Sequence, residues 1–262
     1  MKYSALFFSG FLLCSSFSSE SYTFKGTEKV LDIACGSGKS SRDIARIVEK
    51  GSVLGIDFTK KVINEAKRKN LQGPSNLSFK LKEMDNWDYN SEFDVVRCDS
   101  PHQFIFNQEK LLKNMHALLK KDGHIIVRIP ARLPVALESA LRAVTTSEKW
   151  NDHFLTFHPI FNIYKKSEYT KLLTKNHFSI VNMKTTPSEE IFSSEETFKE
   201  FIKGWLPYFE AVPTELKNDF LEDLTKRYLR ILPLDKEGKV HFFIEKLEVV
   251  AKKQDAVEKM HG

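Results

Sequence analysis

The sequence contains few of the residues that build disulfide-bonded or metal-bound proteins. Among 262 residues there are three cysteines and eight histidines, and neither set has the spacing of metal ligands. Cys14, Cys35 and Cys98 are also too few for a disulfide framework. A packed core must therefore stabilise the chain, and 41% hydrophobic with 29% charged residues is a typical globular composition.

Other missing features exclude further classes of protein. The chain has no Gly-x-Ser-x-Gly sequence, which excludes the nucleophile elbow of serine hydrolases. It has no internal repeat, which excludes a solenoid. Its 40 basic and 35 acidic residues are interleaved along the chain, and this pattern indicates a solvated surface rather than a nucleic-acid footprint. We therefore expect no nucleic-acid partner.

The segment 1–20 resembles a secretory signal, because a basic start precedes a short apolar run and the small-residue triplet 16–18. The apolar run is too short for a stable membrane span, which needs about 20 residues. The alternative is a retained N-terminal helix packed on the domain, although Phe7, Phe8 and Phe11 do not share one helical face with their apolar neighbours. A cleaved segment predicts export, whereas a retained one predicts a cytoplasmic protein.

From residue 28 onward, short apolar runs alternate with helical periodicity, which is typical of a parallel sheet built from β-α-β units. Two strands are expected close to the C-terminal end, at 178–184 and within 240–251, and should form an antiparallel pair at the sheet edge. We predict one domain over 21–262. The other expected strands are 29–33, 52–57, 77–81, 93–98 and 124–129, with helices at 40–49, from Thr59, at 108–120 and at 167–175.

A helical insertion is expected at 190–235, between those last two strands. Its apolar positions recur with helical spacing and are rich in aromatic residues, in a chain with 21 Phe and 7 Tyr. We expect this insertion to lie over the pocket of a substrate.

The most informative segment is 30–38, where a strand leads into a turn of small residues and then into a helix. Such a turn lets the backbone approach a ligand closely, with helix N–H groups beyond it. Asp57 ends the next strand, 25 residues after Asp32, where a carboxylate can accept hydrogen bonds from both hydroxyls of a ribose. The turn and the acid together predict an adenosine-type ligand.

Two phosphate-binding motifs fail at single residues. A P-loop needs a glycine where Ile33 stands, five residues before Gly38. A dinucleotide fold needs a third glycine where Ser41 stands.

Segment 30–38 instead resembles the first motif of class I S-adenosylmethionine-dependent methyltransferases, with Ala34 where the first glycine usually stands. Segments 55–59, 79–85 and 93–96 resemble the second to fourth motifs, so the likeness covers 28–130 as a cofactor-binding core. More loosely, residues 165–250 are similar to the tail of the trans-aconitate methyltransferase-like branch. The resemblance implies an α/β fold: a Rossmann-like, doubly wound, seven-stranded and mostly parallel sheet with a helical insertion near the C-terminus.

The resemblance also implies roles for individual residues. The methionine part of the cofactor would lie against Asp32 and the turn, and Asp57 would bind the ribose hydroxyls. The loop that starts at Cys98 would run beneath the methionine. The remaining cofactor residues implied are Ala34, Cys35, Gly36, Ser37 and Gly38 in the turn, with Phe58, Glu83 and Met84 around the adenine.

The implied activity is methyl transfer from S-adenosylmethionine to a small-molecule acceptor, with a carboxylic acid as one candidate. Gln103 and Phe104 stand where related proteins often carry a His-Trp pair, and Trp205 and Tyr208 are further candidates for the acceptor pocket. No catalytic base is assigned. Two alternatives remain open: a non-catalytic, exported binding module that keeps the fold, and a nucleic-acid methyltransferase. A monomer is the default expectation.

Overall fold

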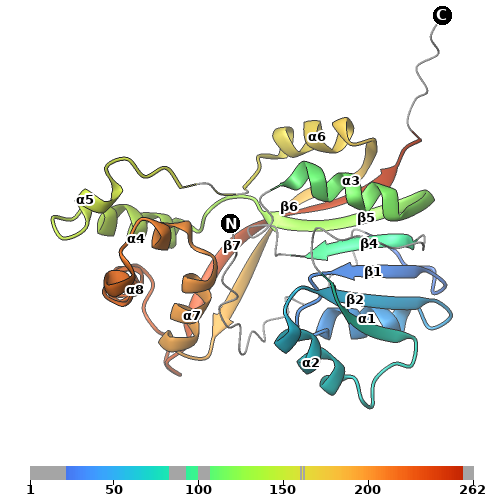
Figure 1. The fold of residues 1–262 in the computed structure, drawn as a ribbon, viewed down its shortest axis with the longest axis horizontal. Helices are drawn as coiled ribbons and strands as arrows, with labels where there is room; N and C mark the ends of the chain where they lie inside the picture. The colour runs from blue at the N-terminus through green and yellow to red at the C-terminus, as the bar shows by residue number, and fades with distance from the viewer. Residues whose placement is uncertain (1–21, 83–92, 100–106, 160, 162, 256–262) are drawn as a thin grey trace, which may run out of the picture.

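The computed structural model describes residues 22–82, 93–99, 107–159, 161 and 163–255. A single sheet of seven strands runs through it in the order β3-β2-β1-β4-β5-β7-β6 (Figure 1). The strands are β1 (Lys29–Ile33), β2 (Ser52–Asp57), β3 (Leu77–Leu81), β4 (Phe93–Asp99), β5 (Leu119–Pro130), β6 (Phe178–Phe192) and β7 (Val240–Lys253).

The first five strands in the chain are parallel to one another, whereas β7 is antiparallel to both β5 and β6. This confirms the predicted mostly parallel sheet and its antiparallel pair at one edge. Parallel strands place their carboxyl ends at one edge of the sheet, which is where ligands bind in open α/β folds. The ends of β1, β2 and β4 therefore lie side by side.

Helices cover the sheet on both faces, which confirms the doubly wound fold (Figure 1). Buried residues of α1 (Lys39–Ile47) and α2 (Lys60–Lys69) pack with β1, β2 and β3 on one face. On the other face, α3 (Gln108–Leu118) and α6 (Lys166–Lys175) pack against the central strands. The alternation of strand and amphipathic helix that the sequence predicted is thus what encloses the sheet.

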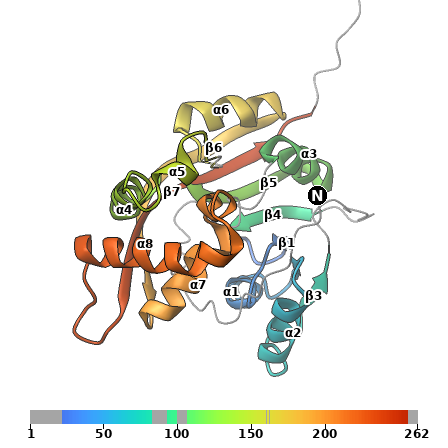
Figure 2. The same cartoon turned by 60° about the vertical axis from the view of Figure 1, so that its left-hand side comes forward.

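The helices of the predicted insertion form a group apart from those that cover the sheet (Figure 2). They share a hydrophobic core of their own, which we call the second core and which includes Phe192, Phe198, Phe220, Tyr228 and Phe242. It contains α7 (Glu195–Trp205), two short 3-10 helices, η3 (Pro207–Glu210) and η4 (Thr214–Leu216), and α8 (Lys217–Ile231). It also contains α4 (Val135–Thr145), which the sequence analysis did not predict. In the chain, α4 is followed by the short helix α5 (Asn151–Phe154). Helix α4 packs chiefly on α8, which is distant in sequence.

Strand β6 is longer than predicted, because it continues from 184 to Phe192 alongside β7. The added half contains Pro187 and is mostly polar from 185 to 190, so its sequence does not have the apolar pattern of a strand. Both features are tolerated because β6 is an edge strand, where one side of the backbone needs no partner strand. This extension carries Phe192 into the second core.

Among the residues that the structure describes, no helix combines the length and the apolar composition needed to cross a bilayer. The signal-like segment 1–20 lies outside those residues, so its role stays a prediction.

We predict that Phe198→Ala destabilises the protein by about 3–5 kcal/mol, as deletion of a buried aromatic ring usually does. The Phe198 side chain is fully buried and lies 4.6 Å from the Tyr228 ring and 5.9 Å from the Phe242 ring. Phe243, in contrast, is 54% exposed, and Phe243→Ala should cost less than about 1 kcal/mol. Urea unfolding measures both changes, and equal losses would contradict a structural role for the second core.

Candidate functional site

The turn between β1 and α1 consists of residues 34–38 and is bent by three left-handed residues. Ala34, Gly36 and Gly38 have φ values of 53°, 55° and 74°. The Cys35 amide donates to the Ile56 carbonyl at 2.9 Å, which fixes the start of the turn to β2. Glycine adopts this conformation without strain, whereas alanine at 34 pays a steric penalty. The turn is therefore a shaped backbone element that β2 holds in place.

The two glycines of the turn face different surroundings. A Cβ atom placed on Gly38 would lie 2.4 Å from the Phe79 ring, and one on Gly55 would lie 2.6 Å from that ring. The ring thus fills the space beneath the turn. A Cβ atom on Gly36 would meet nothing within 4 Å. Gly36 therefore lies on the open side of the turn, where a ligand can approach the backbone.

Asp57 ends β2 directly beside this open side. Its carboxylate accepts hydrogen bonds from the amides of Gly36, at 3.2 Å, and Thr59, at 2.9 Å. Burial raises the pKa of Asp57, although the backbone hydrogen bonds of Thr59 and Gly36 oppose that shift. Each carboxylate oxygen accepts one of these two amides. Phe58 follows with 48% of its surface exposed, which leaves a ring face free for a flat heterocycle.

Asp32 is enclosed rather than open. It is 1% exposed, and its two oxygens accept hydrogen bonds from the Ser41 hydroxyl at 2.6 Å and from Arg97 Nη1 at 2.7 Å. The structure therefore brings Asp32 to the predicted edge but directs its carboxylate into the sheet. Its direct contact with a methionine group stays a prediction.

Arg97 is a site residue that the sequence analysis missed. Its guanidinium is 3% exposed and also donates from Nη2 to Asp99 at 2.5 Å. Asp99 in turn pairs with Arg128 at 3.3 Å, and Arg128 pairs with Glu248 at 3.2 Å. A row of alternating charges thus crosses β1, β4, β5 and β7. The available signal was an arginine within the otherwise apolar strand 93–98.

The two described cysteines of the site are buried. Cys98 is 0% exposed and packs in the core on the α3 side of the sheet, so only its backbone faces the strand end. Burial raises the pKa of both the Cys35 and the Cys98 thiols. Ser37 accepts from Arg42 at 3.1 Å through its carbonyl oxygen. The predicted residues Glu83, Met84, Gln103 and Phe104 lie outside the described residues.

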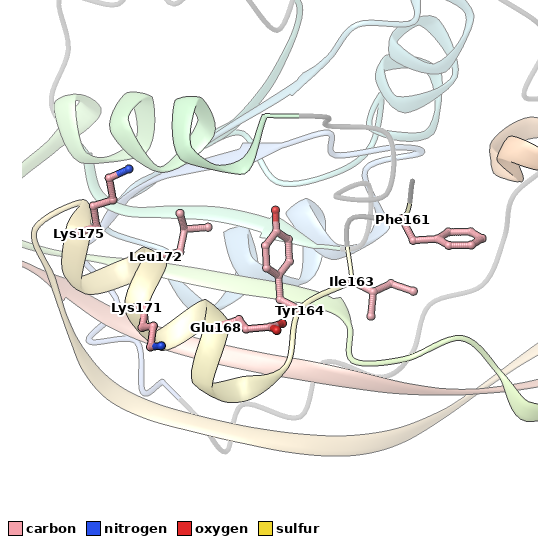
Figure 3. A pocket seen from close by; sticks show the side chains of 7 residues that line it. All are labelled: Phe161, Ile163, Tyr164, Glu168, Lys171, Leu172 and Lys175. Atoms are coloured by element: carbon pink, nitrogen blue, oxygen red, sulfur yellow. The ribbon is translucent and has the colours of Figure 1, made fainter. Parts of the chain in front are cut away.

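The predicted acceptor residues belong to an aromatic cluster on the second core. The Phe161 ring lies 6.4 Å from the Trp205 ring and 6.2 Å from the Tyr208 ring. Trp205 Nε1 is buried and has no hydrogen-bond partner in the part of the chain that the structure describes. Phe161 also lines a hollow of about 540 Å³ along α6 (Figure 3). In Figure 3 the Tyr164 side chain projects from the segment before α6, and the Leu172 side chain projects to the same side from α6 itself.

We predict that Gly38→Ala destabilises the protein more than Gly36→Ala. Both changes place an alanine at positive φ, which costs about 1–2 kcal/mol. Only Gly38→Ala also forces a methyl group into the Phe79 ring, and overpacking of this kind costs a further 1–3 kcal/mol or so. The free energies of unfolding in urea measure the difference. Equal destabilisation would contradict the open side assigned to Gly36.

Comparison with known proteins identifies the family. A family model described as a methyltransferase domain matches residues 24–185. The chain is 20% identical over 236 residues to a trans-aconitate 2-methyltransferase of Variovorax paradoxus, covering 86% of this chain and 87% of that protein. It is 22% identical over 212 residues to a juvenile hormone acid O-methyltransferase of Drosophila melanogaster, covering 76% and 70% respectively.

A solved structure of coclaurine N-methyltransferase, bound to N-methylheliamine and S-adenosylhomocysteine, has the same fold. Its TM-score is 0.55 at 16% identity, covering 90% of this chain and 70% of that one. With the family model spanning more than half of the sequence, the chain belongs to the methyltransferase domain family and is an S-adenosylmethionine-dependent methyltransferase of small molecules.

Proposed function

We propose that the acceptor is a carboxylic acid and that the product is its methyl ester. The proposal deepens the methyl transfer to a small molecule that family membership gives. It depends on the residues at the carboxyl edge of β1, β2 and β4 and on the aromatic cluster of the second core.

The residues at this edge fit the cofactor. The open side of Gly36 admits a ligand to the turn, and the Asp57 carboxylate lies beside that open side, where it can accept hydrogen bonds from ribose hydroxyls. The half-exposed Phe58 ring offers a face on which adenine can stack. When bound there, S-adenosylmethionine supplies a sulfonium methyl group for in-line transfer to a nucleophile.

The observation that carries the proposal is the state of the thiols and phenols among the described residues near this edge. Burial raises the pKa of the Cys35 and Cys98 thiols and of the Tyr164 and Tyr169 phenols. These groups therefore stay protonated near neutral pH and are unsuited to removing a proton. A carboxylate acceptor is already ionised and needs no general base, whereas an amine or alcohol needs one. The protein then has to align the two reactants and exclude water.

The aromatic cluster supports an acceptor with an apolar part. Phe161 lines the hollow in Figure 3, and its ring lies near the rings of Trp205 and Tyr208. The unpartnered Trp205 Nε1 can donate one hydrogen bond to a polar group. Two relatives carry the names of acid substrates, trans-aconitate and juvenile hormone acid. Both names agree with a carboxylic acid for this chain.

We predict that Asp57→Asn weakens binding of S-adenosylhomocysteine about tenfold or more, because hydrogen bonds to a charged group contribute about 1.5–3 kcal/mol. Isothermal calorimetry of the full chain measures the change. Asp43→Asn is the matched control, since Asp43 lies on α1 with 41% of its side chain exposed and pairs with Arg46. Equal affinities for the two variants would exclude Asp57 from the cofactor site.

The acceptor is tested by incubating the protein with methyl-labelled S-adenosylmethionine and a panel of small carboxylic acids. Each acid is matched with the corresponding amine and alcohol of the same carbon skeleton. We expect labelled methyl esters from the acids, which mild alkali hydrolyses with release of labelled methanol. Label that survives alkali, in products of the amines or alcohols alone, would overturn the carboxylic acid proposal.

A further inference from the structure

Strands β6 and β7 continue beyond the end of β5 as a two-stranded ribbon (Figure 1). Pro130, the last residue of β5, lies opposite Lys246 of β7, whereas β6 and β7 stay paired out to Phe192 and Val240. Because β5 is parallel to β4, β1 and β2, residues 186–192 and 240–246 extend past the carboxyl edge of those strands. We call these two segments the ribbon. It rises from the edge that holds the proposed cofactor site.

One face of the ribbon packs on the second core, and the other face is exposed. Phe192 and Phe242 are buried in the second core, whereas Phe243 is largely exposed. Side chains alternate along a strand, and residues in register share a face of the sheet. Glu190 lies opposite Phe242, and Lys246 follows Phe242 by four residues. Both therefore lie on the face that packs on the second core.

Glu190 and Lys246 form a buried ion pair in which one carboxylate oxygen lacks a donor. Glu190 is 8% and Lys246 6% exposed, and Lys246 Nζ lies 2.8 Å from Glu190 Oε1. Glu190 Oε2 is buried and has no hydrogen-bond partner in the part of the chain that the structure describes. Burial of an ion pair is favourable only where hydrogen bonds satisfy its remaining atoms. The geometry therefore calls for a donor that a ligand brings.

The pair also defines what kind of group can bind there. An ammonium has three N–H donors, and among the described residues Lys246 Nζ donates one hydrogen bond, to Glu190 Oε1. A group beside the pair can thus donate to Oε2 and accept from Nζ. A second ammonium cannot accept and an ionised carboxylate cannot donate, whereas a hydroxyl does both. Since the pair is neutral as a whole, a neutral hydroxyl also leaves no uncompensated charge inside the protein.

The pair lies between the proposed cofactor site and the aromatic cluster that contains Trp205. Followed through the registers of β7, β5, β4, β1 and β2, Lys246 shares its face of the sheet with Asp57. On the other side, the Phe242 ring lies 5.4 Å from the Phe201 ring, which is 5.7 Å from the Trp205 ring. An acceptor that extends from the cofactor to the aromatic cluster therefore passes the pair.

We propose that Glu190 and Lys246 bind a hydroxyl group of the acceptor, remote from the carboxylate that is methylated. The hydroxyl donates to Glu190 Oε2 and accepts from Lys246 Nζ, so the substrate class is a hydroxy acid. This inference rests on the proposed methylation of carboxylic acids and narrows it. Glu190 is then a residue that determines specificity and takes no part in the transfer of the methyl group.

The first test uses the unchanged full chain with methyl-labelled S-adenosylmethionine and straight-chain carboxylic acids of increasing length. Each length is supplied as three compounds, with a hydroxyl group, an ammonium group or hydrogen at the end remote from the carboxylate. Label that mild alkali releases as methanol counts as ester. At the length that reaches the pair, kcat/KM for the hydroxy acid should exceed the other two values about tenfold or more, because the analogues leave buried polar atoms unpaired.

Two variants assign this preference to the pair. Glu190→Gln replaces an acceptor oxygen by an amide group and should lower the ratio of kcat/KM between hydroxy and unsubstituted acid to about threefold or less. If that variant does not fold, Glu190→Leu combined with Lys246→Met removes both charges together, which buried pairs usually tolerate. The ratio in the double variant should fall to about one.

Glu189→Gln is the matched control, because Glu189 is the neighbouring residue on the exposed face, where it pairs with His241. It should leave the ratio unchanged. Equal kcat/KM for hydroxy and unsubstituted acids at every length, or an unchanged ratio in the Glu190 variants, would overturn the inference while the methylation of acids stands. If the wild-type protein methylates none of the acids, the proposed function itself fails, which is a different result.

Discussion

An ion pair inside the sheet, between Asp32 of β1 and Arg97 of β4, is the constraint on which the site depends. Both side chains are almost fully buried, and their atoms lie 2.7 Å apart. Because removing one partner would leave an uncompensated charge inside the protein, at a cost of several kcal/mol, the pair also fixes the alignment of the two strands. Ser41 and Asp99 complete its hydrogen bonds. The start of turn 34–38 and the end of β4 are thereby held together.

The remaining geometry of the site follows from this alignment. The turn is anchored on its other side by β2, through Cys35 and Ile56, and the Phe79 ring supports it from below. With strand ends and turn fixed in advance, a ligand has little to order when it binds, which favours affinity. The aromatic second core is a separate cluster, so the surface that we propose for the acceptor can vary without disturbing turn 34–38.

The parallel part of the sheet could be predicted because its strands are short apolar runs between amphipathic helices. Asp57 and the glycine turn were predicted for the same local reason, since both directly follow such a run. Helix α4 was missed, because its partner α8 lies far away in sequence. The roles of Arg97 and Asp99 could not be read either, because they depend on which residue of β1 lies opposite which residue of β4. Register of this kind across 65 residues leaves no trace in local spacing.

A crystal structure of the full chain with S-adenosylhomocysteine is the most direct test of this account. We expect the ribose hydroxyls within hydrogen-bond distance of the Asp57 carboxylate, at about 2.5–3.0 Å. The adenine ring should lie against Phe58. A ligand bound away from the carboxyl edge of β1, β2 and β4, with Asp57 uncontacted, would contradict it.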